Sequence, residues 1–185
     1  MPYRLSLVIA LAVTLAAALS DWKTGKIPDR LTLATLALAP LIHAAFGYEG
    51  DPTAMAALRG FAGSVLGAAA AGVLPFLVLR AGGMGGGDVK LFFALGAITG
   101  PSFAVHAMTY AMMVALVQGL LLVGRRNALR STWRNVLALV NRPLVSRSRR
   151  QGAEVPPAPA MTTMRLALSI FLGTCLASAA LWNPA

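Results

Sequence analysis

Apolar residues dominate the chain in long stretches, and short polar connectors separate these stretches from one another. Six stretches are apolar enough to be interpreted as membrane-spanning helices, namely residues 5–19, 31–46, 60–79, 89–99, 103–123 and 164–182. Crossing a bilayer takes about 20 apolar residues, a length that several of them approach. Residues 89–99 are short, because they would make only about 17 Å of helix. The pattern predicts an all-α, polytopic membrane protein with about six transmembrane helices.

Composition agrees with this interpretation and excludes an ordinary soluble domain. The chain is 57% hydrophobic and 12% charged, whereas a soluble domain carries about 25% charged residues. A net charge of +10 could suggest nucleic acid, but nine of the sixteen basic residues fall between Arg125 and Arg165. In a membrane protein such clustering indicates a cytoplasmic loop that faces anionic lipid. We therefore expect membrane lipids as partners and no nucleic acid.

The first apolar stretch has a second interpretation. Arg4 precedes it and Ala18-Leu19-Ser20 resembles a small-residue cleavage site, as in a secretory signal peptide. Because the remainder of the chain is multi-spanning, we interpret the stretch as the first transmembrane helix.

The distribution of charge predicts which connectors share a side of the membrane. If all six stretches cross, the connectors at 21–30, 80–90 and 124–163 lie on the same side. They contain eight arginines in the last connector and five further basic residues: Lys23, Lys26, Arg30, Arg80 and Lys90. The other side has few basic residues and carries Glu49 and Asp51. The positive-inside rule therefore places the first set in the cytoplasm and both termini outside.

This topology brings two aspartates to the same leaflet. Asp21 ends the first predicted helix and Asp88 opens the fourth, both on the cytoplasmic side. Two neighbouring carboxylates do not both ionise easily, so one holds a proton while the other is charged. An aspartyl hydrolase requires this state: one carboxylate takes a proton from water and the other protonates the carbonyl oxygen. This chemistry needs neither a metal nor a cofactor.

A glycine-rich turn over residues 82–87 leads into Asp88. Glycine allows positive φ and close approach of another chain, which favours a functional turn. A structural interpretation is also open, in which Asp88 caps the fourth helix and Asp21 marks a membrane boundary. Lys90 is interpreted either as a membrane anchor or as a charge that adjusts the protonation of the nearby aspartate pair. Asp29 is interpreted as a turn or helix-start residue.

No metal site is expected from the remaining candidate ligands. His43 and His106 stand alone in apolar segments, which is typical of packing residues, and the lone Cys175 permits no disulfide or cysteine-based zinc site within one chain.

Two motifs resemble those of a known family. Gly85-Gly86-Gly87-Asp88 fits the GxGD signature, and the longer run from Gly83 to Leu91 is similar to its form in type IV prepilin peptidases. Asp21, followed by Ile27-Pro28-Asp29-Arg30-Leu31-Thr32, resembles the first aspartate motif of that family. The resemblance covers roughly residues 5–123.

The resemblance implies an aspartic endopeptidase of the bacterial inner membrane that removes the short basic leader of prepilins at the cytoplasmic face. It implies that Asp21 and Asp88 are catalytic, and that Gly85, Gly86, Gly87 and Lys90 form the loop beside the substrate. It implies no cofactor and no metal.

The chain departs from the larger members of the family, which carry paired CxxC motifs and also N-methylate the new amino terminus. It has neither the cysteines nor the length, so methyltransferase activity is not expected. It is more similar to the short, peptidase-only members associated with Flp/tight-adherence pili. We expect a peptidase core with five spans at 1–123, a basic cytoplasmic loop at 124–163 that includes a helix lying on anionic lipid, and a sixth transmembrane helix at 164–185.

Two other functions stay open at this point. One is a GxGD intramembrane protease or preflagellin peptidase with other substrates. The other is a small transporter or channel, in which the aspartates are ion or proton sites. The sequence leaves open which pilin is cut and which oligomer forms.

Overall fold

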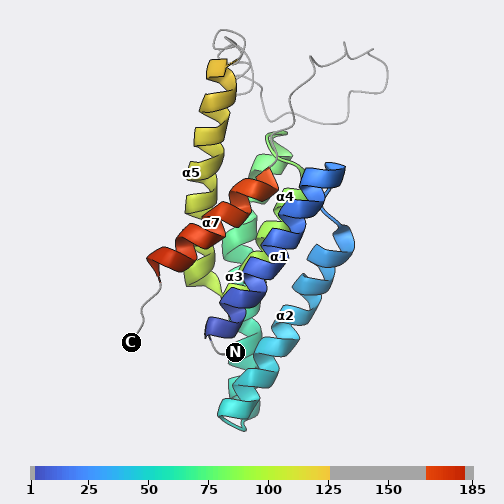
Figure 1. Cartoon of the computed structure of the whole chain (residues 1–185). Coiled ribbons are helices and arrows are strands. Elements are labelled where there is room, and N and C mark those ends of the chain that lie inside the picture. Colours follow the sequence, from blue (N-terminus) through green and yellow to red (C-terminus); the bar gives the residue numbers. More distant parts are fainter. Residues whose placement is uncertain (1–2, 126–165, 182–185) are drawn as a thin grey trace, which may run out of the picture. The chain divides into compact units, whose positions relative to one another are not determined.

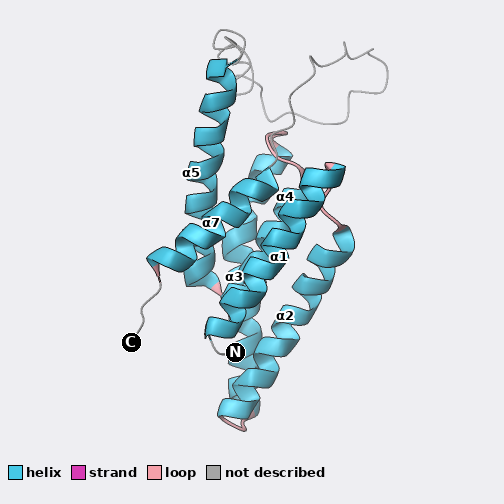
Figure 2. Ribbon diagram, viewed as in Figure 1, coloured by secondary structure: helices cyan, strands magenta, loops and turns pink. Residues whose placement is uncertain are grey.

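The computed structural model describes residues 3–125 and 166–181, and this part of the chain is helical with no strand (Figures 1 and 2). The predicted all-α, polytopic architecture is confirmed. Residues 126–163 of the predicted basic loop lie outside the described residues. The helices are α1 (Tyr3–Thr24), α2 (Asp29–Gly50), α3 (Ala54–Arg80), α4 (Gly86–Thr99), α5 (Pro101–Arg125) and α7 (Leu166–Ala180).

The chain divides into two compact units. The first comprises Met1–Leu116 together with Arg165–Ala185, and the second comprises Val117–Met164. Of the second unit, the structure describes only the last residues of α5. The candidate site and the groove discussed below belong to the first unit.

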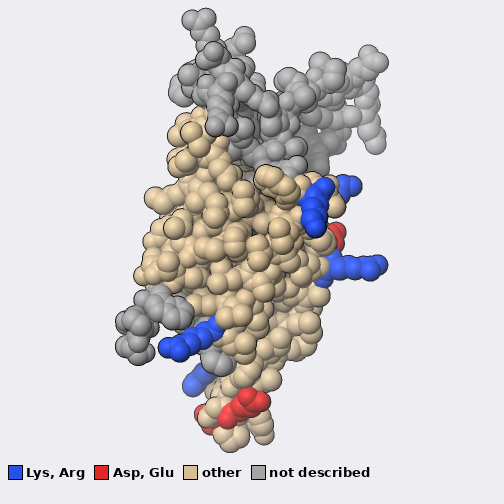
Figure 3. All heavy atoms as spheres, in the orientation of Figure 1, with Lys and Arg blue, Asp and Glu red and all other residues tan. Residues whose placement is uncertain are grey.

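Four of the described helices are long and apolar enough to cross a membrane: α1, α2, α3 and α5. α7 is apolar but shorter. On the face drawn in Figure 3, charged side chains gather toward the ends of the helices and leave an uncharged region between them. This distribution is the one expected of helices whose middle sections face hydrocarbon, where a charged side chain is costly.

α4 is the central helix of the first unit. It packs against α1, α2, α3 and α7, and its side chains at Leu91, Phe92 and Leu95 are buried. Its 14 residues rise about 21 Å, less than the roughly 30 Å of a bilayer's hydrocarbon core. A short helix is tolerated here because neighbouring helices cover it, so its ends need not reach the lipid head groups.

Small residues allow α3 and α4 to approach closely. A Cβ atom at Gly67 would collide with the Gly96 carbonyl oxygen, and one at Gly96 would collide with Gly67 in return. Beside this contact the buried Ser64 hydroxyl donates a hydrogen bond of 2.7 Å to the Ala97 carbonyl oxygen. At Gly63, about one turn earlier on α3, an added Cβ atom would meet no atom within 4 Å. Small size therefore serves close helix packing at Gly67, as is common between membrane helices, and not at Gly63.

The connectors between α1, α2 and α3 are shorter than the polar pattern predicts. Helix continues through most of the polar segment at 21–30 and leaves residues 25–28 as the link, while 51–53 alone link α2 to α3. Local capping explains both boundaries. Gly25 ends α1 with φ 67° and donates its N–H to the Asp21 carbonyl oxygen. The Thr53 hydroxyl accepts a hydrogen bond from the Ala56 N–H at 3.2 Å and begins α3.

Candidate active site

The end of α1, the start of α2, the end of α3 and the start of α4 meet at one end of the first unit (Figure 1). We call this region, residues 21–30 and 80–90, the glycine-turn end. Both sequence motifs fall within it. The helices reverse direction at each short connector, which brings together two segments that are distant in the sequence.

The first part of the glycine turn ends α3. Gly82 has φ 83° and its N–H donates to the Leu79 carbonyl oxygen, while the Gly83 N–H donates to the Val78 carbonyl oxygen. These two bonds form a Schellman motif, which requires a residue in the left-handed conformation. Positive φ at Gly82 therefore stops the helix and turns the chain toward α4.

The second part of the turn needs small residues and not unusual backbone angles. Gly85 is the N-cap of α4 with φ −77°. A Cβ atom at Gly85 would lie 3.0 Å from Asp88 Oδ2, and one at Gly87 would lie 3.3 Å from the Ile27 side chain. Gly86 faces open space. Gly87 thus marks the point where the glycine turn meets the connector between α1 and α2.

Asp88 lies three residues after the N-cap, in the first turn of α4. Its carboxylate receives a hydrogen bond from the Gly85 backbone N–H. This is one half of a capping box, in which the third residue of the helix reaches back to the N-cap. Asp88 therefore does take part in capping α4.

The environment of Asp88 favours its protonated form. Asp88 lies outside the four candidate membrane spans, and burial together with the nearby negative charge of Asp21 raises its pKa from 3.8 to about 6, against the opposing effect of the Gly85 hydrogen bond. The Asp21 contribution means that the two carboxyl groups are close enough to repel each other. The structure thus brings Asp21 and Asp88 together.

Asp21 lies in the last turn of α1, half-buried. A helix dipole stabilises negative charge at the N-terminus of a helix and not at its C-terminus. Asp88 has in part a capping role at the start of its helix. The same role does not explain an aspartate at position 21, at the end of a helix. The proximity of Asp21 to Asp88 is the more informative observation.

Lys90 forms an ion pair with Asp29 and so engages a partner outside the Asp21–Asp88 pair. The distance from Lys90 Nζ to Asp29 Oδ1 is 2.7 Å, and the two side chains are 40% and 63% exposed. An ion pair this exposed contributes at most about 1 kcal/mol to stability. It does join the first residue of α2 to the first turns of α4. Sequence reasoning missed the pair, although opposite charges in two connectors of the same leaflet were a usable signal.

The histidines contact backbone. His43 Nε2 lies 2.8 Å from the Ile98 carbonyl oxygen, and His106 Nδ1 lies 2.8 Å from the Ser102 carbonyl oxygen. Within residues 3–125 and 166–181, no three His, Cys, Asp or Glu side chains cluster so as to hold a metal ion.

The raised pKa of Asp88 predicts how stability changes with pH in the Asp88→Asn variant. The folded protein binds the Asp88 proton more tightly than the unfolded chain, so burial of this group costs stability as the pH rises from about 4 through about 6. Asp88→Asn should therefore unfold a few degrees above the wild type at pH 8, with the difference vanishing near pH 4. Thermal unfolding in detergent across this range measures it. An Asn variant that is less stable than the wild type at pH 8 would contradict the raised pKa.

Comparison with known proteins assigns the chain to a family. A model of the type IV leader peptidase family matches residues 8–120, which is more than half of the chain and includes Asp21, the glycine turn and Asp88. No curated protein and no solved structure matches significantly. The match accords with the several apolar helices that can span a membrane. The chain belongs to the type IV leader peptidase family, and it is a multi-pass membrane peptidase that takes a prepilin-like substrate.

Proposed function

We propose that the protein is an aspartic endopeptidase in which Asp21 and Asp88 together hydrolyse the peptide bond. The observation that carries this proposal is the shared environment of the two carboxyl groups: burial and, second, the nearby charge of Asp21 raise the pKa of Asp88, so groups from separate motifs lie close together. Pairs of carboxyl groups with separated pKa values are typical of sites that use one as acid and the other as base. The matched family supports the assignment to a peptidase.

In this mechanism the two aspartates have distinct roles at the start of the reaction. Asp88, with its pKa raised to about 6, holds the proton and donates it to the oxygen of the scissile carbonyl. Asp21 acts as the general base and takes a proton from a water molecule as that water's oxygen attacks the carbonyl carbon. When the tetrahedral intermediate collapses, the C–N bond breaks and Asp21 returns its proton to the departing amine. Asp88 recovers a proton from the intermediate as the new carboxyl group forms.

We further propose that the bond cut joins a short basic leader to a Flp-like prepilin, at the cytoplasmic face of the bacterial inner membrane. The glycine-turn end carries Lys23, Lys26, Arg30, Arg80 and Lys90, and a concentration of basic residues is the mark of a cytoplasmic face. The opposite end, at 49–51, carries acidic residues. The glycine turn leaves Gly86 open, so an extended substrate backbone has room to approach the site there.

The direct test is replacement of each aspartate by asparagine with a co-expressed prepilin as substrate. Asp21→Asn and Asp88→Asn should each lower leader cleavage by several orders of magnitude, since an amide keeps the shape but does not exchange the proton. The double variant should be little worse than either single one, because residues that act as a unit are strongly non-additive. Asp51→Asn, at the other end of the helices, should cleave at the wild-type rate.

Cleavage is followed by the shift in prepilin mobility on a gel, with expression and membrane insertion checked for every variant. Wild-type-like processing by either single variant would remove that aspartate from the site. No leader cleavage by the wild-type protein, together with ion flux in vesicles, would favour a transporter instead.

Substitution in the glycine turn separates two reasons for glycine. Gly87→Val should push against Ile27, destabilise the fold by about 1–3 kcal/mol and lower cleavage by on the order of 100-fold through misplacement of Asp88. An added Cβ atom at Gly86 would meet no protein atom within 4 Å, so the stability of Gly86→Val should stay close to that of the wild type, and any loss of cleavage would report contact with the substrate. Thermal unfolding and the prepilin assay are measured on both. Normal processing by Gly87→Val would show that the turn is only a linker.

A further inference from the structure

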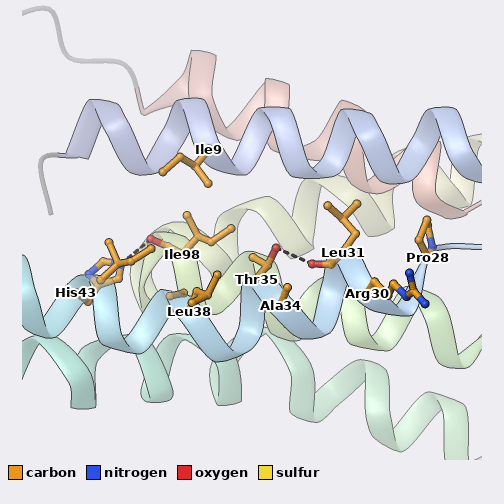
Figure 4. Close-up of a pocket in the computed structure, with 11 residues that line it drawn as sticks. Ile9, Pro28, Arg30, Leu31, Ala34, Thr35, Leu38, His43 and Ile98 are labelled. Atoms are coloured by element: carbon orange, nitrogen blue, oxygen red, sulfur yellow. Dashed lines mark hydrogen bonds between the residues drawn. The ribbon is translucent and has the colours of Figure 1, made fainter.

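A half-open groove of about 570 Å³ runs between α1 and α2 (Figure 4). The two helices make few contacts with each other, and both pack against α4. Ile9 projects from α1 on one side, α2 forms the other side, and Ile98 of α4 lies between them. The groove begins beside the glycine-turn end at Pro28 and extends to His43, a length of about 22 Å along α2.

The interior of the groove suits an apolar occupant. Its two polar side chains within the span are already bonded: the Thr35 hydroxyl donates to the Leu31 carbonyl oxygen at 2.7 Å, and His43 Nε2 lies 2.8 Å from the Ile98 carbonyl oxygen. The remaining lining there is aliphatic, including Leu38 and Ile42. This section therefore offers few hydrogen-bonding groups to a polar ligand.

The end of the groove at the glycine turn has the opposite character. Arg30 lines it, is exposed, and has no hydrogen bond or ion pair within the described part of the chain. The guanidinium group is a planar fork of donors that matches a phosphate group in two-point contacts. An occupant that complements the whole groove is therefore a long apolar chain with an anionic group at one end.

Size distinguishes a hydrocarbon chain from a helix. A helix about 10 Å wide and 22 Å long fills on the order of 1,700 Å³, about three times the volume of the groove. At roughly 30 Å³ for each methylene, close to the share of a water molecule in the liquid, 570 Å³ holds one chain of somewhat fewer than twenty carbons. Arg30 would in addition repel the basic leader of a substrate placed there.

We propose that the groove is a binding site for an anionic phospholipid, with one acyl chain between α1 and α2 and the phosphate group on Arg30. The site is separate from the Asp21–Asp88 pair and does not depend on the proposed peptidase mechanism. Because it opens beside Ile27 of the connector and Asp29 at the start of α2, an occupied groove holds α2 in place against the glycine turn.

Lipid retention by the purified full-length protein tests this site. The protein is reconstituted in vesicles of phosphatidylglycerol and phosphatidylcholine with identical chains, extracted in mild detergent, and weighed by native mass spectrometry. The wild type should retain one phosphatidylglycerol in preference to phosphatidylcholine, by about fivefold for one basic residue at the membrane surface. Arg30→Gln should reduce the preference to near unity, and Ala34→Phe, which fills the groove, should lose the retained lipid.

Two matched variants control for general effects. Arg80→Gln removes a basic residue from the same end of the unit, and Ala37→Phe adds the same ring on α2 at an exposed position outside the groove. Both should retain lipid as the wild type does. If Ala34→Phe fails to fold, Arg30→Gln still decides the matter.

Unchanged lipid preference in Arg30→Gln, or equal loss in the control variants, would overturn the proposal. A photo-crosslinker at position 34 supplies a second readout: a lipid adduct supports the site, whereas an adduct with co-expressed prepilin or with a second copy of the chain would show another occupant and contradict it.

Discussion

The burial of one carboxyl group beside a second, at the edge of an apolar bundle, is the constraint on which the rest of this structure depends. Asp88 is partly withdrawn from water and lies near Asp21, and both effects raise its pKa to about 6. Such an arrangement costs folding free energy at neutral pH and persists only if packing elsewhere compensates for it. The hydrogen bond from the Gly85 N–H offsets part of the cost. The proposed chemistry depends on the part of this cost that is not offset. The carboxyl pair that is unfavourable in the folded protein is also the pair that can both donate and accept a proton during the reaction.

α4 supplies that compensation and sets the position of Asp88. Its buried face contacts four other helices, and the close approach at Gly67 and Gly96 fixes its depth against α3. Two contacts hold the start of α2 and the connector before it against the first turns of α4. Ile27 of the connector lies beside Gly87, and Asp29 forms an ion pair with Lys90. Each contact is small alone, but together they limit the positions that α1, and with it Asp21, can take relative to Asp88.

The sequence predicts the helical class, the polytopic character and the two aspartates at a shared end, because apolar length and motif spacing are properties of the chain itself. It overestimates the length of the connectors, because the helices continue into polar residues as far as the local caps at Gly25 and Thr53. It does not distinguish which glycine needs which property, whereas Gly82 needs positive φ, Gly87 needs room beside Ile27, and Gly86 needs neither within the described fold. The Lys90–Asp29 pair and the groove between α1 and α2 depend on how helices diverge in space, which no periodicity in one chain records.

The proximity of Asp21 and Asp88 is the central claim, and cysteine cross-linking measures it most directly. In a Cys175→Ser background, the pair Asp21→Cys with Asp88→Cys is treated in native membranes with a short bifunctional thiol reagent. The pair Asp51→Cys with Asp88→Cys serves as the control from opposite ends of the helices. We predict an intramolecular cross-link in the first pair and none in the second. Absence of a cross-link in the first pair, with each cysteine singly reactive toward a monofunctional reagent, would contradict the shared site.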